Sequence, residues 1–269
     1  MLYHFIKRVV PAIAPFAAAA MAAGVAGCDG MDVRFGDKQG VPLAELDMSG
    51  DPPTGLVLGS PDTVILRTGD ALDIDVSGDP EAVDRMRFAI EDGSLAIARE
   101  KDRWGRGDTS KATINVTMPA PGSLVLAGSG VVEADELASE VEIVIAGSGE
   151  LRVKSLAAEK VDLTVAGSGD MQASGAVRNL DMSIAGSGNA DLSAVEVETA
   201  DLSIAGSGTA SFASDGTVDA SIMGSGRVTV TGNATCEVDT MGSGKLVCRP
   251  RAGDARSAAS DANEGWASF

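Results

Sequence analysis

The sequence predicts an all-β protein built as a parallel, right-handed β-solenoid (a β-helix) with coils of about nineteen residues and a β-rich lead-in. Three observations lead to this prediction. A glycine-containing tripeptide recurs at nearly constant spacing, the residues around it alternate between apolar and polar, and aromatic residues make up only 3% of the chain, so that the core must be aliphatic. The 33 glycines also exceed what a helical protein would tolerate.

The repeated tripeptide is Gly-Ser-Gly, and its spacings are 19, 20, 19, 20, 18 and 18 residues. Stacked coils would pair each strand with its equivalent about 4.8 Å away along the axis. A corner that returns in every coil needs a positive φ or a close backbone approach, and glycine permits both. The serine is expected to hydrogen-bond to neighbouring turn amides as a ladder. The tripeptides begin at Gly128, Gly147, Gly167, Gly186, Gly206, Gly224 and Gly242.

The residues before each tripeptide alternate with a period of two. Val161, Leu163 and Val165 fall on one face of a strand, and Asp162 and Thr164 fall on the other. This period is typical of strands with one buried face, so the apolar residues are expected to point into the solenoid.

The region before the repeat, from residue 54 to about 120, is β-rich but is expected not to be in register with the repeat. We expect it to belong to the same domain and to cover one end of the solenoid. A helix is expected over residues 80–88 and a charged loop over residues 100–110. The expected strands cover residues 63–66, 71–76, 94–98 and 111–118.

The N-terminal segment is typical of an export signal. Lys7 and Arg8 precede an apolar run over residues 9–25, which is short for a membrane span and contains two prolines. The run ends in Val25-Ala26-Gly27-Cys28, which resembles a bacterial lipobox, so the Cys28 thiol is expected to carry a diacylglycerol. The alternative is an ordinary secretory signal with a chance cysteine. The choice between inner and outer membrane stays open.

The domain organisation follows from these segments. Residues 1–27 are predicted to be a signal peptide, residues 28–53 a flexible tether, residues 54–249 the solenoid domain and residues 250–269 a disordered tail.

One outward position carries acidic residues in almost every coil, five residues before the tripeptide. Stacking would align these side chains at about 4.8 Å, a spacing at which like charges in water repel only weakly. A solvated face is the simpler interpretation, and a weak Ca²⁺ site is the functional one. The acidic residues are Glu142, Asp162, Asp181, Asp201, Asp219 and Glu237.

Two cysteines, Cys236 and Cys248, flank the last tripeptide at inward positions. An exported protein meets an oxidising compartment, so a disulfide that closes the last coil is one hypothesis, and two buried thiols are the other. A Cα–Cα distance above about 7 Å would exclude the bond.

The composition argues against most catalytic chemistry and against nucleic acid. The only histidine, His4, lies in the predicted signal peptide, so no histidine-based triad or metal site is expected, and the chain provides no other cofactor motif. The net charge of −18 repels polyanions. A basic loop is the exception; it is expected to be solvated, with membrane or polyanion contact as the alternative. It contains Arg99, Lys101, Arg103, Trp104, Arg106 and Lys111.

The Ala-Gly-Ser-Gly coils, the segment Ile90-Glu91-Asp92-Gly93-Ser94-Leu95-Ala96-Ile97 and the segment Val116-Thr117-Met118-Pro119 resemble the bacterial putative auto-transporter adhesin family with a head GIN domain. The resemblance covers residues 54–248. It implies an exported β-helical protein, often a lipoprotein, at the cell surface or in the periplasm. It brings no catalytic residues.

These observations predict a non-catalytic lipoprotein of the bacterial cell envelope with a binding, adhesin-like or structural role. Its expected partners are the membrane, through the lipid anchor, and an envelope protein or polysaccharide. A polysaccharide-acting enzyme on a β-helix scaffold is one alternative, and a self-assembling envelope scaffold is another, because solenoid ends expose unpaired strand edges.

Overall fold

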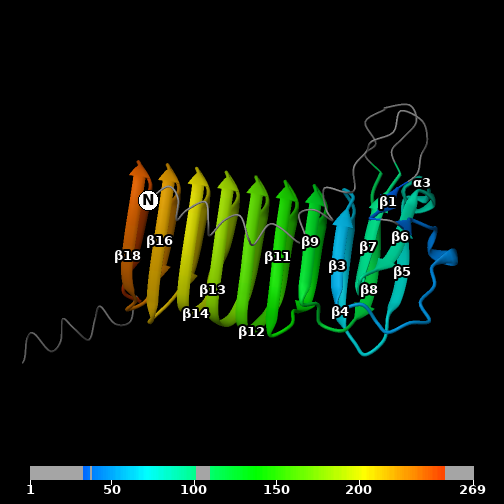
Figure 1. The fold of residues 1–269 in the computed structure, drawn as a ribbon, viewed down its shortest axis with the longest axis horizontal. Coiled ribbons are helices and arrows are strands. Elements are labelled where there is room, and N and C mark those ends of the chain that lie inside the picture. Colours follow the sequence, from blue (N-terminus) through cyan, green and yellow to red (C-terminus); the bar gives the residue numbers. More distant parts are fainter. Residues whose placement is uncertain (1–32, 37, 101–109, 252–269) are drawn as a thin grey trace, which may run out of the picture.

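The computed structural model describes residues 33–36, 38–100 and 110–251. Figure 1 shows an elongated stack of parallel strands, with the C-terminal coils at one end and the N-terminal elements at the other. The stack is a parallel β-solenoid of about seven turns, so the predicted fold class is confirmed.

The strands fall into three groups along the chain. A small hairpin precedes the solenoid and consists of β1 (Arg34–Phe35) and β2 (Lys38–Gln39). The N-terminal strands are β3 (Gly55–Gly59), β4 (Thr63–Thr68), β5 (Asp73–Gly78), β6 (Met86–Glu91), β7 (Ser94–Arg99) and β8 (Ala112–Met118). The repeat strands are β9 (Ser123–Gly128), β10 (Val131–Glu136), β11 (Glu140–Gly147), β12 (Glu150–Gly167), β13 (Asp170–Gly186), β14 (Asn189–Gly206), β15 (Thr209–Ala213), β16 (Thr217–Gly224), β17 (Arg227–Thr231), β18 (Thr235–Gly242) and β19 (Lys245–Arg249).

The repeat coils stack in register. Leu163 of β12 aligns with Met182 of β13, and Met182 aligns with Leu202 of β14. All three side chains are at most 3% exposed, because the alternating apolar residues point into the solenoid as predicted. The core is therefore a pile of aliphatic layers that runs along the axis.

The tandem glycines form the corner of each coil. Gly167 has a φ of +122°, and a Cβ atom there would lie 2.5 Å from the carbonyl oxygen of Gly147 in the preceding coil. The second glycine of the tripeptide is equally confined, since a Cβ on Gly149 would lie 2.8 Å from Leu126 Cδ2. Both glycines are thus required, the first by its φ and by close stacking, the second by close stacking.

The serine ladder runs through the backbone rather than through the hydroxyls. The N–H of Ser168 donates to the carbonyl oxygen of Gly147 at 2.8 Å, and the N–H of Ser187 donates to that of Gly167 at 2.8 Å. The serine side chains are exposed at the corner. The hydroxyl ladder that the sequence led us to expect is therefore replaced by a backbone ladder.

The lead-in is in register with the coils, which corrects the expectation that it is not. Leu56 of β3 aligns with Leu124 of β9 on one side and with Leu95 of β7 on the other. Val64 of β4 aligns likewise with Val132 and Ile114. The chain thus inserts its first coil, β3 and β4, between the β7/β8 coil and the β9/β10 coil.

The expected helix over residues 80–88 is correct only in its first half. Helix α3 (Pro80–Asp84) begins after Asp79, whose carboxylate accepts the N–H of Glu81 at 2.9 Å. The chain then enters β6, which pairs antiparallel with β7. Met86 and Phe88 are at most 2% exposed, so sheet packing decides the conformation of this segment.

The expected tether over residues 28–53 is also partly folded. Phe35 of β1 is 8% exposed and packs with Ala89, Ala96 and Ala98. The short 3-10 helix η1 (Leu43–Glu45) brings Leu43 against the main core. This part of the predicted tether therefore belongs to the domain.

Candidate binding surfaces

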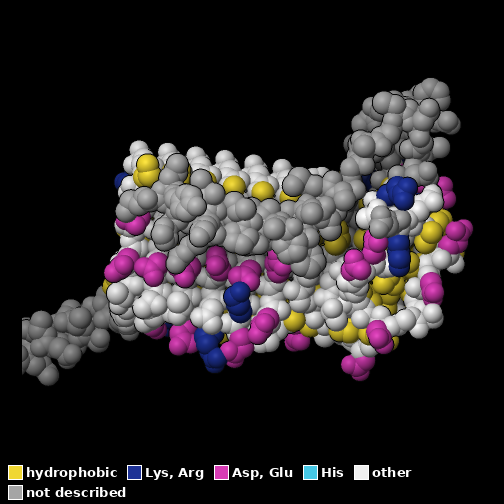
Figure 2. Space-filling view, viewed as in Figure 1, with side chains coloured by type: hydrophobic (Ala, Val, Ile, Leu, Met, Phe, Trp, Pro, Cys, Tyr) yellow, Lys and Arg dark blue, Asp and Glu magenta, His cyan; other side chains and the backbone are white. Residues whose placement is uncertain are grey.

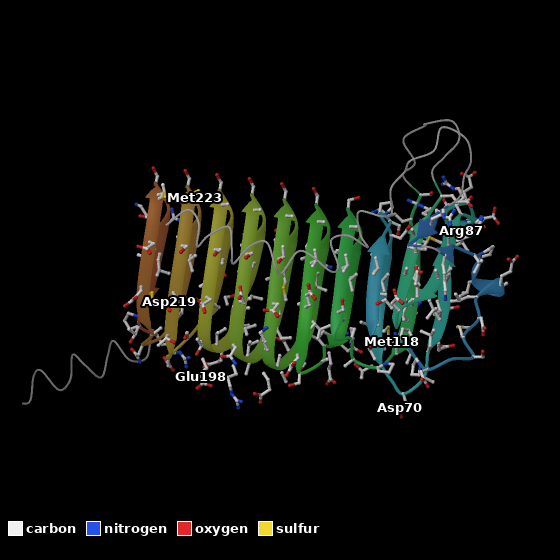
Figure 3. All side chains as sticks on the ribbon, in the orientation of Figure 1. Asp70, Arg87, Met118, Glu198, Asp219 and Met223 are labelled. Atoms are coloured by element: carbon white, nitrogen blue, oxygen red, sulfur yellow. A yellow bond between two sulfur atoms is a disulfide. The ribbon has the colours of Figure 1, made fainter. Side chains whose placement is uncertain are left out.

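The acidic row forms a ladder along one face of the solenoid. Asp162 aligns with Asp181, and Asp201 aligns with Asp219. Figure 2 shows acidic side chains in a row along the stack, and Figure 3 labels Asp219 within it. The register therefore brings these predicted residues together on one surface, as the spacing requires.

A groove of about 950 Å³ lies over the C-terminal part of this ladder. We call it the acidic groove. Beside each carboxylate it carries a second row, which the register aligns as Ser183, Ser203, Ser221 and Asp239. The described residues that line the groove include no basic side chain. They are Asp181, Ser183, Asp201, Leu202, Ser203, Asp219, Ala220, Ser221, Glu237, Val238 and Asp239.

The acidic ladder is less uniform at its other end. Burial raises the pKa of Glu142, the charge of Asp162 raises it further, and Lys160 opposes the change. Lys160 Nζ donates to Asp162 Oδ2 at 2.7 Å, and this hydrogen bond raises the pKa of Lys160. The ladder therefore carries a compensating cation near Asp162, whereas none of the described residues that line the groove is basic.

We expect Glu142→Gln to stabilise the protein at neutral pH. A carboxyl whose pKa is higher in the folded chain destabilises the fold above its unfolded pKa and contributes nothing below both values. The gain at pH 7 should be below about 1 kcal/mol, because water screens this partly buried group. Urea unfolding at pH 7 and pH 3 measures it. A benefit of equal size at both pH values would contradict this explanation.

The metal hypothesis gains no further support from the structure. Among the described residues, no three His, Cys, Asp or Glu side chains are grouped so that they could hold a metal ion. Calcium binding by the ladder stays a prediction, which titration calorimetry with millimolar Ca²⁺ tests.

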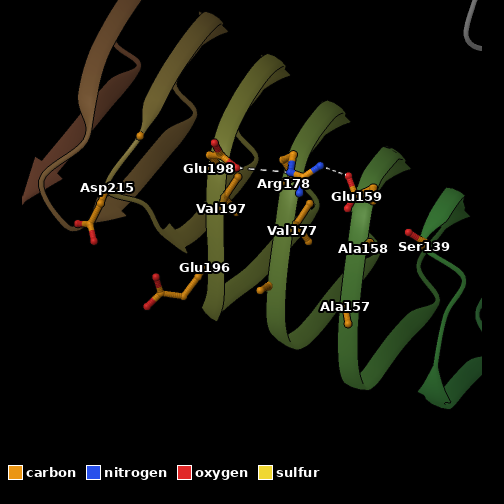
Figure 4. A pocket seen from close by; sticks show the side chains of 12 residues that line it. Ser139, Ala157, Ala158, Glu159, Val177, Arg178, Glu196, Val197, Glu198 and Asp215 are labelled. Atoms are coloured by element: carbon orange, nitrogen blue, oxygen red, sulfur yellow. Dashed lines mark hydrogen bonds and ion pairs between the residues drawn. The ribbon is translucent and has the colours of Figure 1, made fainter.

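A second groove, of about 790 Å³, runs along the third side of the coils (Figure 4). We call it the mixed-charge groove. Its floor is apolar, since Ala158, Val177 and Val197 are at most 8% exposed. Arg178 lies between two carboxylates: it hydrogen-bonds to Glu159, and its Nε lies 3.6 Å from Glu198 Oε2. Sequence reasoning missed this groove because the third side lacks a repeated motif.

The two C-terminal cysteines form a disulfide in the structure, with their Cα atoms 6.9 Å apart. Cys236 aligns with buried Val218, and Cys248 aligns with buried Val230, so both occupy inward positions of the last coil. They are less buried than those valines because no described coil follows.

We expect Cys236→Ser with Cys248→Ser to destabilise the C-terminal coil. The bond joins residues 12 apart, and closing a loop of this size stabilises a fold by about 2–3 kcal/mol. Mass spectrometry without reductant should show a mass lower by about two hydrogens than that of the reduced chain. Limited proteolysis should cut the chain that lacks the disulfide, whether reduced or mutated, first near residues 235–249. Equal cleavage with and without reductant would contradict the expectation.

The basic loop lies mostly outside the described residues. Of its two described members, the Arg99 side chain is buried and Lys111 is exposed. The side chain of Arg99 is 5% exposed and lies 3.5 Å from Asp62 Oδ1, and Lys111 Nζ donates to the carbonyl oxygen of Pro61 at 2.6 Å. Asp62 also accepts the N–H of Ala112 at 2.8 Å. These contacts fix the base of the loop, and buried Arg99 is not part of a solvated basic surface, whereas Lys111 is exposed as expected.

The other terminal predictions cannot be placed. The signal peptide, Cys28 and the tail beyond Arg251 lie outside the described residues. Within the described part of the chain, no helix is both long and apolar enough to span a membrane.

A family model described as the putative auto-transporter adhesin, head GIN domain, matches residues 52–234. The chain belongs to this family. The match includes the lead-in and all but the last coil, so the head GIN domain of this protein is the solenoid itself. No curated protein is detectably similar to the chain.

Solved structures share the fold. A putative adhesin from Bacteroides fragilis superimposes with a TM-score of 0.66 at 19% identity, covering 74% of this head GIN protein and 92% of that chain. A putative lipid binding protein from Parabacteroides distasonis gives 0.53 at 22% identity, covering 74% and 93%. A putative adhesin from the same species gives 0.52 at 17%, covering 74% and 92%. At these identities the likeness shows the fold alone.

Proposed function

We propose that this head GIN protein is a non-catalytic lipoprotein of the bacterial cell envelope, periplasmic or at the cell surface. Its Cys28 carries the lipid, and its solenoid binds an extended partner. Membership of an adhesin family, the lipobox-like segment and the two axial grooves support the proposal.

The observation that carries the binding role is the in-register repetition along the acidic groove. Each coil presents one carboxylate and, in the neighbouring row, a hydroxyl or a second carboxylate. A partner that extends along the axis would meet the same groups at every step of about 4.8 Å. The absence of basic residues from the described lining, together with an aromatic content of 3%, favours a basic extended segment of an envelope protein over a sugar chain.

The binding role is tested with a lysine decapeptide in a fluorescence anisotropy titration of the full chain. Removing two carboxylates with Asp201→Asn and Asp219→Asn should weaken binding at least about tenfold at low salt, and added salt should weaken the wild type. The matched control removes two carboxylates from the mixed-charge groove, with Glu159→Gln and Glu198→Gln, and should bind as the wild type does. Equal losses in both variants would show a response to net charge only. Tighter binding to purified cell-wall polysaccharide than to the peptide would overturn the choice of partner.

The anchor is tested separately by labelling cells with radioactive palmitate. The wild-type chain should carry label and sediment with membranes. Cys28→Ser should carry none and should move to the soluble fraction or stay as an uncleaved precursor. Label on the serine variant would refute acylation at Cys28.

A further inference from the structure

The two ends of the solenoid are built differently. At the N-terminal end, β5 and β6 pair antiparallel with β8 and β7 and close the stack, as Figure 1 shows. At the C-terminal end, β18 pairs with β16 and β19 pairs with β17. Among the described residues, no strand pairs with the outer edges of β18 and β19.

The open end exposes the continuation of the core. Val238 aligns with buried Ala220 but is 45% exposed. Leu246 aligns with buried Val228 and is itself only partly buried. An apolar layer at an open sheet edge is a typical site for adding another strand.

The hydrogen bonds to the preceding coil show which backbone groups of β18 and β19 point towards the open end. The N–H of Thr235 donates to Gly216, and those of Ser243 and Lys245 donate to Gly224 and Gly226, all in the preceding coil. Peptide groups alternate in direction along a strand. The N–H and C=O groups that point towards the open end are therefore those of Val238, Thr240, Leu246 and Cys248.

The charges on the two edge strands are opposite. The outward positions of β18 carry Glu237 and Asp239, and those of β19 carry Lys245 and Arg249. An identical strand placed on β18 would bring carboxylates together, whereas β19 of a second copy would bring cations to them. The disulfide joins β18 to β19 and holds the two edges in a fixed relation before any contact forms.

We propose that this end binds the same end of a second copy, forming a twofold dimer in which β18 of each copy pairs antiparallel with β19 of the other. Positions equidistant from Ser243 then lie opposite each other. Val238 faces Cys248 of the second copy with both peptide groups directed across the interface, and Glu237 faces Arg249 of the second copy. In this one register the backbone groups can hydrogen-bond across the interface, apolar side chains meet, and opposite charges face each other.

The dimer is the end point of assembly. A twofold contact uses the same surface on both copies, so no open C-terminal end remains after it forms, and the N-terminal ends are closed. A single coil presents a small area, as is typical of reversible interfaces. This inference does not depend on the proposed ligand or on acylation.

The test exchanges the paired charges and measures mass by sedimentation equilibrium of the full chain in density-matched detergent. Glu237→Arg and Arg249→Glu should each raise the dimer dissociation constant at least about tenfold, because each places like charges opposite each other twice. The double variant should return to within about threefold of the wild type. Reversing Arg227, an outward residue one coil further in, with Arg227→Glu is the matched control and should change nothing.

The outcomes separate the possibilities. Rescue in the double variant supports the proposed register, and it also shows that the single variants fold. A monomeric wild type at hundreds of micromolar would overturn the proposal. Masses that grow beyond two copies, or single variants that dimerise like the wild type, would overturn it as well.

Discussion

Replacing Gly167 with alanine should abolish stable folding of the middle coils. Its φ of +122° lies in a region that side-chain-bearing residues rarely adopt, and its added Cβ would lie 2.5 Å from the carbonyl oxygen of Gly147. Neither of these two backbone segments can move aside, because Gly167 is also stacked against Gly186 in the following coil. Strain and clash together should cost about 3–5 kcal/mol, measured by urea unfolding followed by circular dichroism.

The control for this variant is Ser168→Ala at the neighbouring position of the same corner. The serine side chain is exposed, and its contribution to the ladder is the backbone N–H, which alanine keeps. The unfolding midpoint should therefore stay within the error of the wild type. A large loss for Ser168→Ala would show that the hydroxyl matters and that the backbone explanation is incomplete.

Truncating Phe212 to alanine should have the second large effect. The ring is 1% exposed and occupies a core position that Leu192 fills in the preceding coil and Val230 in the next. Removing it leaves a cavity that the stacked β-strands cannot close, so a loss of about 3–5 kcal/mol is expected in thermal or urea unfolding.

Phe212→Leu is the matched control, since leucine is the residue that this position carries one coil earlier. It should cost less than about 1.5 kcal/mol because the layer stays filled. If the leucine and alanine variants were equally destabilised, the specific shape of the ring rather than the filling of the layer would control packing here.

The repeat region could be predicted in detail from the sequence. The regular spacing of the tripeptide predicts the length of each coil, and the alternation predicts which residues point inward. Asp162, Asp181 and Asp201 therefore had to align once the coils stacked. The inward placement of Cys236 and Cys248 follows from the same rule. These features follow from the period of the local sequence and do not depend on contacts between distant segments.

The lead-in could not be predicted in the same way. The corner between β3 and β4 uses Ser60-Pro61-Asp62 in place of Gly-Ser-Gly, so it leaves no repeated signal. Its first coil also pairs with strands on both sides that come much later in the chain. Met86–Glu91 is a strand because β7 offers an edge, which is a non-local cause.

The sequence by itself determined the class of fold, the coil length, the aliphatic core and the acidic ladder, because each depends on a period of two or on a period near nineteen residues. Only the tertiary structure decided the order of the N-terminal coils, the packing of Phe35, the bridging of two glutamates by Arg178 and the difference between a closed and an open end. Those features depend on which distant segments meet, and contact between distant segments is settled by packing of the whole chain rather than by any local pattern.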